Sequence, residues 1–476
     1  MPVFERVSRY PHPRAAVFAW HTRPGAFVRL TPPGMATMLR PPTDGINPGS
    51  EVLLRLSHPL IAGLLPSLPV GKKGPVGVNW RVRHVELVPG ELFVDEQVRG
   101  PFKSWRHEHV FSDGPGDSTV ITDRITWELP VNLPGSLDQA LVEMQLDGLF
   151  AFRERQLRDD LDVHARLSAS PRRIVVAGAS GLIGSQLCGL LTSGGHTVVR
   201  LVRSGTAVPS TDGGKQDQPA RWDPAKGWVE PGALQGADAV VNLAGHSIGG
   251  HFTRKHEAKI LSSRLDATTT LVKALTASGV STLVQASGIG VYGPRRPGEL
   301  LTEESEPGDG VLAEVVRAWE GATEPAARAG VRTALLRTGI VLSEGGGALA
   351  PQVPLYSIGL GGRLAAPDAW MSWVSLDDTA RAYLHALLTD LVVGPVNLVA
   401  PRPVTNQEFA TTLGRVLHRP ALVPTPAFGP KLVLGERGYD QMIDTDQRVS
   451  SAKLVDAGFW FAQGNLGDAL RHALMR

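Results

Sequence analysis

Three glycines with the spacing of a phosphate-binding turn follow an apolar run near residue 174. The segment 174–184 reads Ile-Val-Val-Ala-Gly-Ala-Ser-Gly-Leu-Ile-Gly, which predicts a strand, a tight turn and a helix start. Gly178 would allow the turn, Gly181 would let the backbone approach a pyrophosphate, and Gly184 would let the helix pack on the strand. The helix N-terminus attracts phosphate. The segment therefore predicts a dinucleotide site with contacts from Gly178, Ser180, Gly181, Leu182, Ile183 and Gly184.

The next predicted strand, 196–203, indicates which dinucleotide binds. NAD enzymes usually carry Asp or Glu near the end of this strand to bind the ribose 2′-hydroxyl. Here the end reads Arg-Leu-Val-Arg-Ser and has no carboxylate. Because side chains alternate along a strand, Arg203 lies on the opposite face from Arg200. We expect Arg203 to bind the 2′-phosphate of NADP(H); the alternative is that both arginines are solvated surface charges.

The elements around this turn form a repeating pattern. Apolar runs at 174–177, 196–202, 239–243 and 282–285 alternate with helical stretches. Nearly continuous apolar strands separated by helices are typical of a parallel sheet that is covered on both faces. We therefore expect an α/β, Rossmann-type, doubly wound sheet over 172–400, followed by a small C-terminal domain, 401–476.

The segment 1–168 follows a different pattern. Alternating polar and apolar residues at 80–87 and 119–127 predict antiparallel strands, and a helical stretch over 136–167 would be about 45 Å long. A curved sheet on a long helix leaves a cavity for a small apolar ligand. The alternative is that its aromatic residues only fill the core. The expected lining is Phe93, Phe102, Trp105 and Trp127, with Arg99 and His107 at a polar end.

Composition narrows the class of protein. The 476 residues are 42% hydrophobic and 20% charged with a net charge of +2, so nothing favours nucleic acid or an anionic membrane as partner. The one cysteine, Cys188, excludes an internal disulfide and falls in an apolar helical stretch, which indicates a core position. Residues 1–6 lack the order of a signal peptide, and the apolar window 52–70 is interrupted by charges and prolines. A cytoplasmic protein is expected.

Several motifs follow the glycine turn along the chain. With the turn 178–184, the segments Val241–Gly245, Ser287–Gly293 and Leu336–Gly339 resemble the extended short-chain dehydrogenase/reductases. A second set consists of Trp222–Pro224, Lys259 with Ser263-Arg264, Trp373 with Asp377-Asp378, Gly394–Asn397, Arg419-Pro420, Gly435-Glu436, Gln447–Val449 and Ala457–Phe459. This set resembles, more narrowly, the epimerase-like family often labelled sugar nucleotide epimerase or cell-division inhibitor. The resemblance covers about 172–476 and includes a family-specific C-terminal domain.

The first segment resembles a START/SRPBCC helix-grip domain, an α+β fold. The resemblance rests on 24–33, 93–97 and 100–102, with Trp105, His107 and His109. The two histidines alternate along a strand and could suggest a metal. No acidic or cysteine partner at ligand spacing accompanies them in the sequence, so we interpret them as polar groups of the pocket or surface and expect no metal.

The epimerase resemblance implies further cofactor contacts. Asp223 matches the acid near the adenine, and Leu243, Ala244 and Gly245 match the ribose and nicotinamide side. The alternative is that these four residues only form a tight strand end.

Catalysis is the least regular part of the resemblance. Reductases of this superfamily use a Tyr as general acid with a Lys four residues on, and the matching stretch, 310–320, has neither. Ser287 and Tyr292 are the catalytic candidates, and the alternative for Tyr292 is a packing role. Glu314 is a further candidate, for which a solvated position on a helix is the favoured interpretation. Arg337 and Trp373 are expected on the substrate side, although either could be structural.

Two functions remain open from the sequence. One is an NADP(H)-dependent, epimerase-like oxidoreductase that acts on a small molecule. The other is an NADP(H)-binding protein with little turnover, which senses redox state or presents a ligand held by the N-terminal segment.

Overall fold

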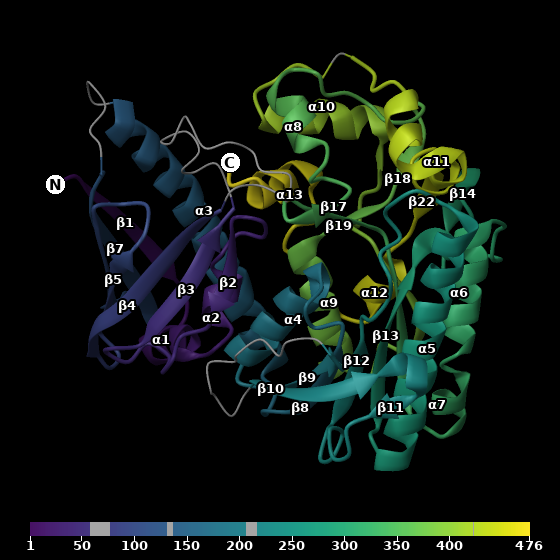
Figure 1. The fold of residues 1–476 in the computed structure, drawn as a ribbon, viewed down its shortest axis with the longest axis horizontal. Coiled ribbons are helices and arrows are strands. Elements are labelled where there is room, and N and C mark those ends of the chain that lie inside the picture. Colours follow the sequence, from purple (N-terminus) through teal and green to yellow (C-terminus); the bar gives the residue numbers. More distant parts are fainter. Residues whose placement is uncertain (58–76, 131–136, 206–216, 422) are drawn as a thin grey trace.

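The computed structural model describes residues 1–57, 77–130, 137–205, 217–421 and 423–476 (Figure 1). The apolar window 52–70 lies partly outside these residues. An antiparallel sheet with one long helix occupies one side of Figure 1, and a parallel sheet with its helices occupies the other. No helix among the described residues is long and apolar enough to cross a membrane.

The N-terminal part is a seven-stranded antiparallel sheet with the order β1-β7-β6-β5-β4-β3-β2. The expected strands at 80–87 and 119–127 are confirmed, as is the long helix. The 31 residues of α3 (Leu137–Leu167) pack against the sheet, and the short helices α1 (Arg14–Thr22) and α2 (Ala26–Arg29) follow the first strand. The strands are β1 (Val3–Tyr10), β2 (Ala36–Arg40), β3 (Glu51–Leu56), β4 (Val78–Val88), β5 (Leu92–Arg99), β6 (Ser104–Gly114) and β7 (Ser118–Glu128).

The central part is an eight-stranded sheet with the order β11-β10-β9-β8-β12-β13-β15-β20, parallel except where β11 joins. This order confirms the Rossmann-type sheet that the sequence predicts. Its strands are β8 (Arg173–Ala177), β9 (Thr197–Arg203), β10 (Asp217–Asp223), β11 (Trp228–Val229), β12 (Ala239–Asn242), β13 (Thr282–Gly288), β15 (Arg332–Thr338) and β20 (Gly394–Leu398).

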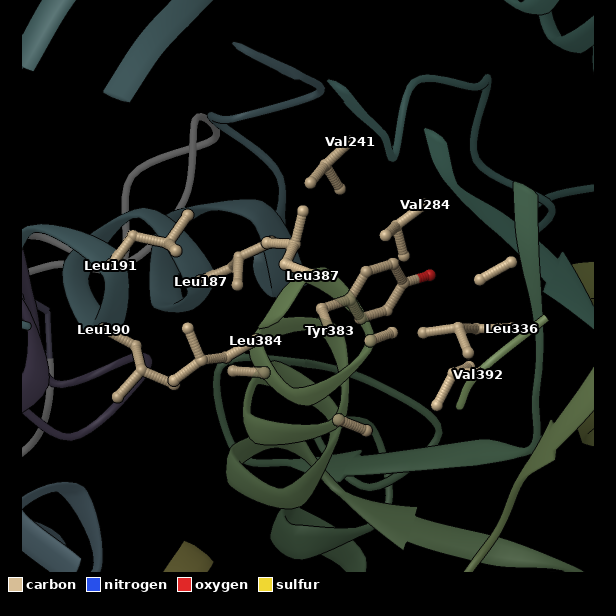
Figure 2. Close-up of a cluster of buried hydrophobic side chains, with 14 of the residues drawn as sticks. Leu187, Leu190, Leu191, Val241, Val284, Leu336, Tyr383, Leu384, Leu387 and Val392 are labelled. Carbon is tan, nitrogen blue, oxygen red and sulfur yellow. The ribbon is translucent and has the colours of Figure 1, made fainter. Parts of the chain in front are cut away.

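Helices cover both faces of this sheet. On one face α4 (Leu182–Ser193) and α9 (Leu376–Leu388) bury an apolar cluster that includes Leu187 and Tyr383 (Figure 2). Cys188 is buried in the same cluster, as expected. On the other face α5 (Arg254–Ser278) buries Leu271 and Leu275, with α7 (Glu324–Arg328) beside it. Apolar burial on both faces explains why the strands read as continuous apolar runs.

The C-terminal part shares its core with the loops that follow β15. Leu342, Tyr356 and Trp373 pack in one buried cluster with Leu413 and Leu470. Leu413 lies on the helix Asn406–Val416 and Leu470 on the helix Leu466–Ala473. The helices and strands not yet named, in the central and C-terminal parts, are β14 (Arg295–Leu301), α6 (Val311–Gly321), β16 (Ile340–Ser343), β17 (Gly346–Gly347), α8 (Val353–Ser357), β18 (Trp370–Met371), β19 (Trp373–Ser375), β21 (Val404–Thr405), α10 (Asn406–Val416), α11 (Phe428–Met442), β22 (Asp446–Val449), α12 (Ala452–Asp456) and α13 (Leu466–Ala473).

A buried network of charges joins the three parts. Arg29 in α2 binds Asp160 in α3 through Nε and Nη2 at 2.7 Å each, and its Nη2 lies 2.9 Å from Asp377 Oδ1 in α9. His472 in α13 lies 3.3 Å from the other oxygen of Asp377. Burial alone would raise the pKa of Asp377, but the charge of Arg29 and the hydrogen bond and charge of His472 together outweigh burial and hold this pKa well below its usual value. The carboxylate of Asp377 therefore stays ionised inside the protein.

Candidate functional site

The glycine turn has the geometry that its sequence predicts. Gly178 takes a φ of +79°, which favours glycine, and a Cβ there would lie 2.6 Å from the carbonyl carbon of Leu243. A Cβ on Gly184 would lie 2.2 Å from the carbonyl oxygen of Gly178. Both positions therefore need glycine, the first for the backbone and the second for the close approach of α4 to the turn.

A cavity of about 840 Å³ opens beside this turn, at the carboxyl ends of β8, β9, β10 and β12. In open α/β sheets, ligands bind at this edge. Eight of the expected cofactor-binding residues line the cavity: Gly178, Ser180, Gly181, Arg203, Asp223, Leu243, Ala244 and Gly245.

The other three expected cofactor contacts are not among the residues that line the cavity. Leu182, Ile183 and Gly184 form the first turn of α4. Ile183 packs against the apolar core, and Gly184 is buried against the glycine turn. Contact of these three residues with a cofactor stays a prediction that concerns the backbone at the start of the helix.

The cavity wall carries more positive than negative side chains. Arg200, Arg203 and Lys259 line it, against Asp223 and Asp266. Although Arg200 and Arg203 alternate along β9, both reach the cavity, since Arg203 is the last residue of the strand. A surplus of positive charge suits a ligand with several phosphates.

Lys259 is a residue that the sequence analysis quoted as a motif and gave no role. It lies on α5 with Ser263 one turn later, and both line the cavity. The spacing of Lys259 and Ser263 could have predicted this, because residues four apart share one face of a helix. Partial desolvation and then the charge of Lys259 hold the pKa of the neighbouring His246 below its usual value.

The N-terminal part supplies one wall of this cavity. Pro24, Val28, Met38, Leu39, Pro41 and Pro42 line it. Pro24 and Pro42 also line a second cavity, of about 230 Å³, between α3 and the antiparallel sheet. Nothing in the sequence pattern predicted this contact, because it joins segments more than a hundred residues apart.

The catalytic candidates form a buried polar network on neighbouring strands. Ser287, near the end of β13, donates to Glu320 Oε1 at 2.5 Å. Arg337, near the end of β15, donates to both oxygens of Glu320 at 2.9 Å. Arg337 Nη1 also donates to the hydroxyl of Tyr292 at 3.1 Å, and that hydroxyl donates to Asn397 Oδ1 at 2.7 Å. The structure thus brings Ser287, Tyr292 and Arg337 together, through an acid that the sequence analysis missed.

The structure changes the expected roles of Arg337 and Trp373. Glu320 compensates the charge of Arg337, so Arg337 orders the network and its charge is already paired. Trp373 is fully buried, and its Nε1 donates to the carbonyl of Arg402 at 3.1 Å. The expectation that Trp373 faces a substrate is therefore wrong, because it packs in the core shared with the C-terminal part. Glu314 is exposed on α6, in agreement with its solvated alternative.

Replacing Tyr292 with phenylalanine should lower any measured turnover by less than about tenfold, because no lysine activates this hydroxyl. Burial raises its pKa, and Arg337 only partly offsets that effect. Steady-state rates with saturating cofactor would measure the change. A loss of a hundredfold or more with unchanged cofactor affinity would contradict the prediction and identify a general acid.

The second cavity lies where the sequence predicted one, with a partly different lining. Phe93, Phe102, Trp105 and His107 line it as expected. Trp127 is fully buried behind Trp105, and Arg99 is exposed, so neither is part of the described lining. The polar end is formed instead by His21, His84, Asp95, His107, His109 and Arg153. The statement that no acidic partner accompanies the two histidines is also wrong, because Asp95 and Asp123 lie beside them.

Comparison with known proteins agrees with this architecture. Residues 174–398 match the NAD dependent epimerase/dehydratase family, and residues 425–473 match the domain of unknown function DUF1731. An epimerase family protein of Mycobacterium bovis is 39% identical over 304 residues, which cover 64% of this chain and 98% of the relative. The human epimerase family protein SDR39U1 is 31% identical over 307 residues, which cover 63% of this chain and 98% of the human protein.

Solved structures extend the likeness. A nucleoside-diphosphate sugar epimerase from Corynebacterium glutamicum aligns with 99% of this chain and 90% of its own, with a TM-score of 0.77 and 32% identity. Human SDR39U1, solved with NADPH, aligns with 63% of this chain and 98% of its own, with a TM-score of 0.56 and 30% identity. The strand order, the glycine turn and these likenesses lead to one conclusion: the chain belongs to the NAD-dependent epimerase/dehydratase family.

Proposed function

We propose that this protein is an NADP(H)-dependent, epimerase-like oxidoreductase that acts on a small molecule. One observation carries the proposal: Arg203 ends β9, a strand that contains no carboxylate, and it lines a cavity at the glycine turn. An arginine recognises a 2′-phosphate through charge-assisted hydrogen bonds. The NADPH in the structure of human SDR39U1 supports the same choice of cofactor.

The cofactor would lie along the carboxyl edge of the sheet. Its pyrophosphate would meet the N-terminus of α4 beside Gly181, where backbone N–H groups and the helix dipole favour negative charge. Asp223 would face the adenine, and Leu243 to Gly245 would follow the ribose towards the nicotinamide.

The substrate would meet the carboxyl ends of β13 and β15, next to β12 in the sheet. Ser287 is the candidate to polarise a substrate oxygen. Its hydroxyl donates to Glu320 Oε1 at 2.5 Å, so it would turn from this acid to donate to a substrate. Tyr292 would hold this region in place through Arg337 and Asn397. Membership of the epimerase family favours this function over a binding protein without turnover.

Oxidation of NADPH at 340 nm, measured with a panel of sugar nucleotides, aldehydes and ketones, would test the activity. Turnover with any compound that Ser287→Ala abolishes, while NADPH still binds, would support the proposal. Binding of NADPH without turnover across the panel would favour the sensing alternative.

We propose that the N-terminal part is a START/SRPBCC-like helix-grip domain over about 1–168 that binds an apolar or amphipathic small molecule. Its single antiparallel sheet, its long C-terminal helix and the cavity between them support this proposal. The cavity wall is mainly apolar, with Phe93, Phe102 and Trp105 on one side and Leu146 and Leu149 of α3 on the other.

A ligand of this cavity should raise the melting temperature of the full chain, because it binds only the folded state. At a hundredfold excess over its dissociation constant the gain is about 2.7 kcal/mol. A lipid and metabolite screen by thermal shift would measure it. The full chain is required, because Arg29 and Asp160 are buried against the other parts. Leu149→Trp should fill the cavity and remove the shift; a screen in which no compound moves the melting temperature would make this part a scaffold.

A further inference from the structure

Four side chains from three neighbouring strands meet at the polar end of the N-terminal cavity. Asp95 on β5 pairs with His107 on β6, and His109 pairs with Asp123 on β7. Because residues two apart share a face of a strand, His107 and His109 both point to the cavity side. All four side chains are largely buried, with exposed fractions between 5% and 15%.

The two imidazoles lie side by side between the two carboxylates, with ring centroids 3.7 Å apart. Asp123 Oδ1 lies 3.0 Å from His107 Nε2 and 2.8 Å from His109 Nδ1. The opposite ring nitrogens both face Asp95 Oδ2, His109 Nε2 at 3.3 Å and His107 Nδ1 at 3.7 Å. Asp123 therefore contacts one nitrogen of each ring, and Asp95 faces the other nitrogen of each ring.

Asp95, His107 and His109 offer ligand atoms that all lie within 4.8 Å of one another. In a tetrahedral zinc site the bonds are about 2.0–2.2 Å, which places neighbouring ligand atoms about 3.3–3.5 Å apart. The separations from Asp95 Oδ2, 3.3 and 3.7 Å, come close to this value. Asp123 adds the feature expected behind ligating histidines, a carboxylate that fixes each ring through its other nitrogen.

We propose that Asp95, His107 and His109 bind one divalent transition-metal ion, with Asp123 as a positioning residue. Two histidines and one carboxylate suit Zn²⁺, Fe²⁺ and neighbouring divalent ions, and leave at least one coordination position open. That position faces the cavity, since all three residues line it. The metal would thus offer an anchor for an oxygen of a bound ligand.

Charge indicates the kind of ligand that would take the open position. Because a histidine that binds a metal is neutral, the two carboxylates contribute two negative charges, and the half-buried Arg153 at the same cavity contributes one positive charge. A divalent ion leaves the site with one surplus positive charge. An apolar molecule with an anionic oxygen, such as a carboxylate head, would neutralise it.

Titration of the chelator-treated full chain with Co²⁺ and Zn²⁺ would test the site. We expect one equivalent of Co²⁺ to give visible d–d absorption that Zn²⁺ displaces. The separate variants Asp95→Asn, His107→Gln and His109→Gln should each lose it. Asp123→Asn should weaken binding about 10- to 100-fold, because the ring nitrogens lose their orientation.

His12→Gln is the matched control, because His12 also pairs with an aspartate, with its Nε2 2.8 Å from Asp162 Oδ1, and is not among the residues that line the cavity. It should bind the metal as the wild type does. Circular dichroism would show whether each variant folds. If the variants do not fold, the wild-type titration decides, because no saturable binding there overturns the proposal. Binding that all three folded ligand variants retain would overturn it as well.

Discussion

Replacing Arg203 with alanine should weaken NADPH binding roughly ten- to a hundredfold, the equivalent of a charge-assisted contact worth about 1.5–3 kcal/mol. NADH affinity should change little, since NADH lacks the 2′-phosphate. In the wild type NADPH should therefore bind more tightly than NADH. Fluorescence titration of both cofactors against both proteins would measure these differences.

The matched control for this experiment is Arg328→Ala. Arg328 is an exposed arginine on α7 whose partner is Glu324, and it is not among the residues that line the cavity. It should leave both affinities unchanged. Equal affinities of the wild type for NADPH and NADH would contradict the assignment of Arg203 to the 2′-phosphate. An Arg203→Ala variant that binds NADPH like the wild type would contradict it as well. Arg200, which lines the same cavity, would then be the next residue to replace.

Replacing Arg29 with methionine should destabilise the whole chain by about 3–5 kcal/mol, the cost of leaving a buried charge without its partner. Methionine fills similar space, but Asp160 and Asp377 would lose the guanidinium that binds both. Asp160 would keep a hydrogen bond from Gln156 at 2.9 Å, and Asp377 would keep His472 at 3.3 Å. One such contact for each carboxylate does not replace the guanidinium. Urea unfolding followed by circular dichroism would show a lower midpoint.

Arg124→Met is the control for the stability experiment. Arg124 pairs with Glu5 at 2.9 Å, and their side chains are 52% and 46% exposed. An exposed pair contributes less than about 1 kcal/mol. If Arg29→Met costs no more than this control, the three parts are joined by apolar packing and the charges add nothing to it.

Local patterns in the sequence were enough to predict the cofactor side of the site. The turn at Gly178, the strand that ends at Arg203 and the strand end before Leu243 each depend on a few consecutive residues. The order in which parallel strands assemble then places their carboxyl ends together. For that reason eight of the expected contacts line one cavity.

The substrate side and the second cavity depend on contacts between distant residues. Glu320 binds Arg337 across 17 positions, and nothing in its own helix marks it as a partner. Asp123 reaches His107 only once β6 and β7 pair in one register. A one-residue shift of that pairing would turn the aspartate to the other face of the sheet. Such contacts are fixed by packing and register, which one sequence does not reveal.

The buried network at Arg29 also bears on the order in which the chain can finish folding during synthesis. Arg29 and Asp160 leave the ribosome early, whereas His472, which stacks on Phe152 at 4.4 Å and lies 3.1 Å from Gln156, follows much later in the chain. Translation at about 5–20 residues per second needs about 15–60 s for the roughly 300 residues between Asp160 and His472. Until α13 emerges, the nascent N-terminal part keeps this face of α3 open to water and to chaperones, and the arrival of α13 covers it.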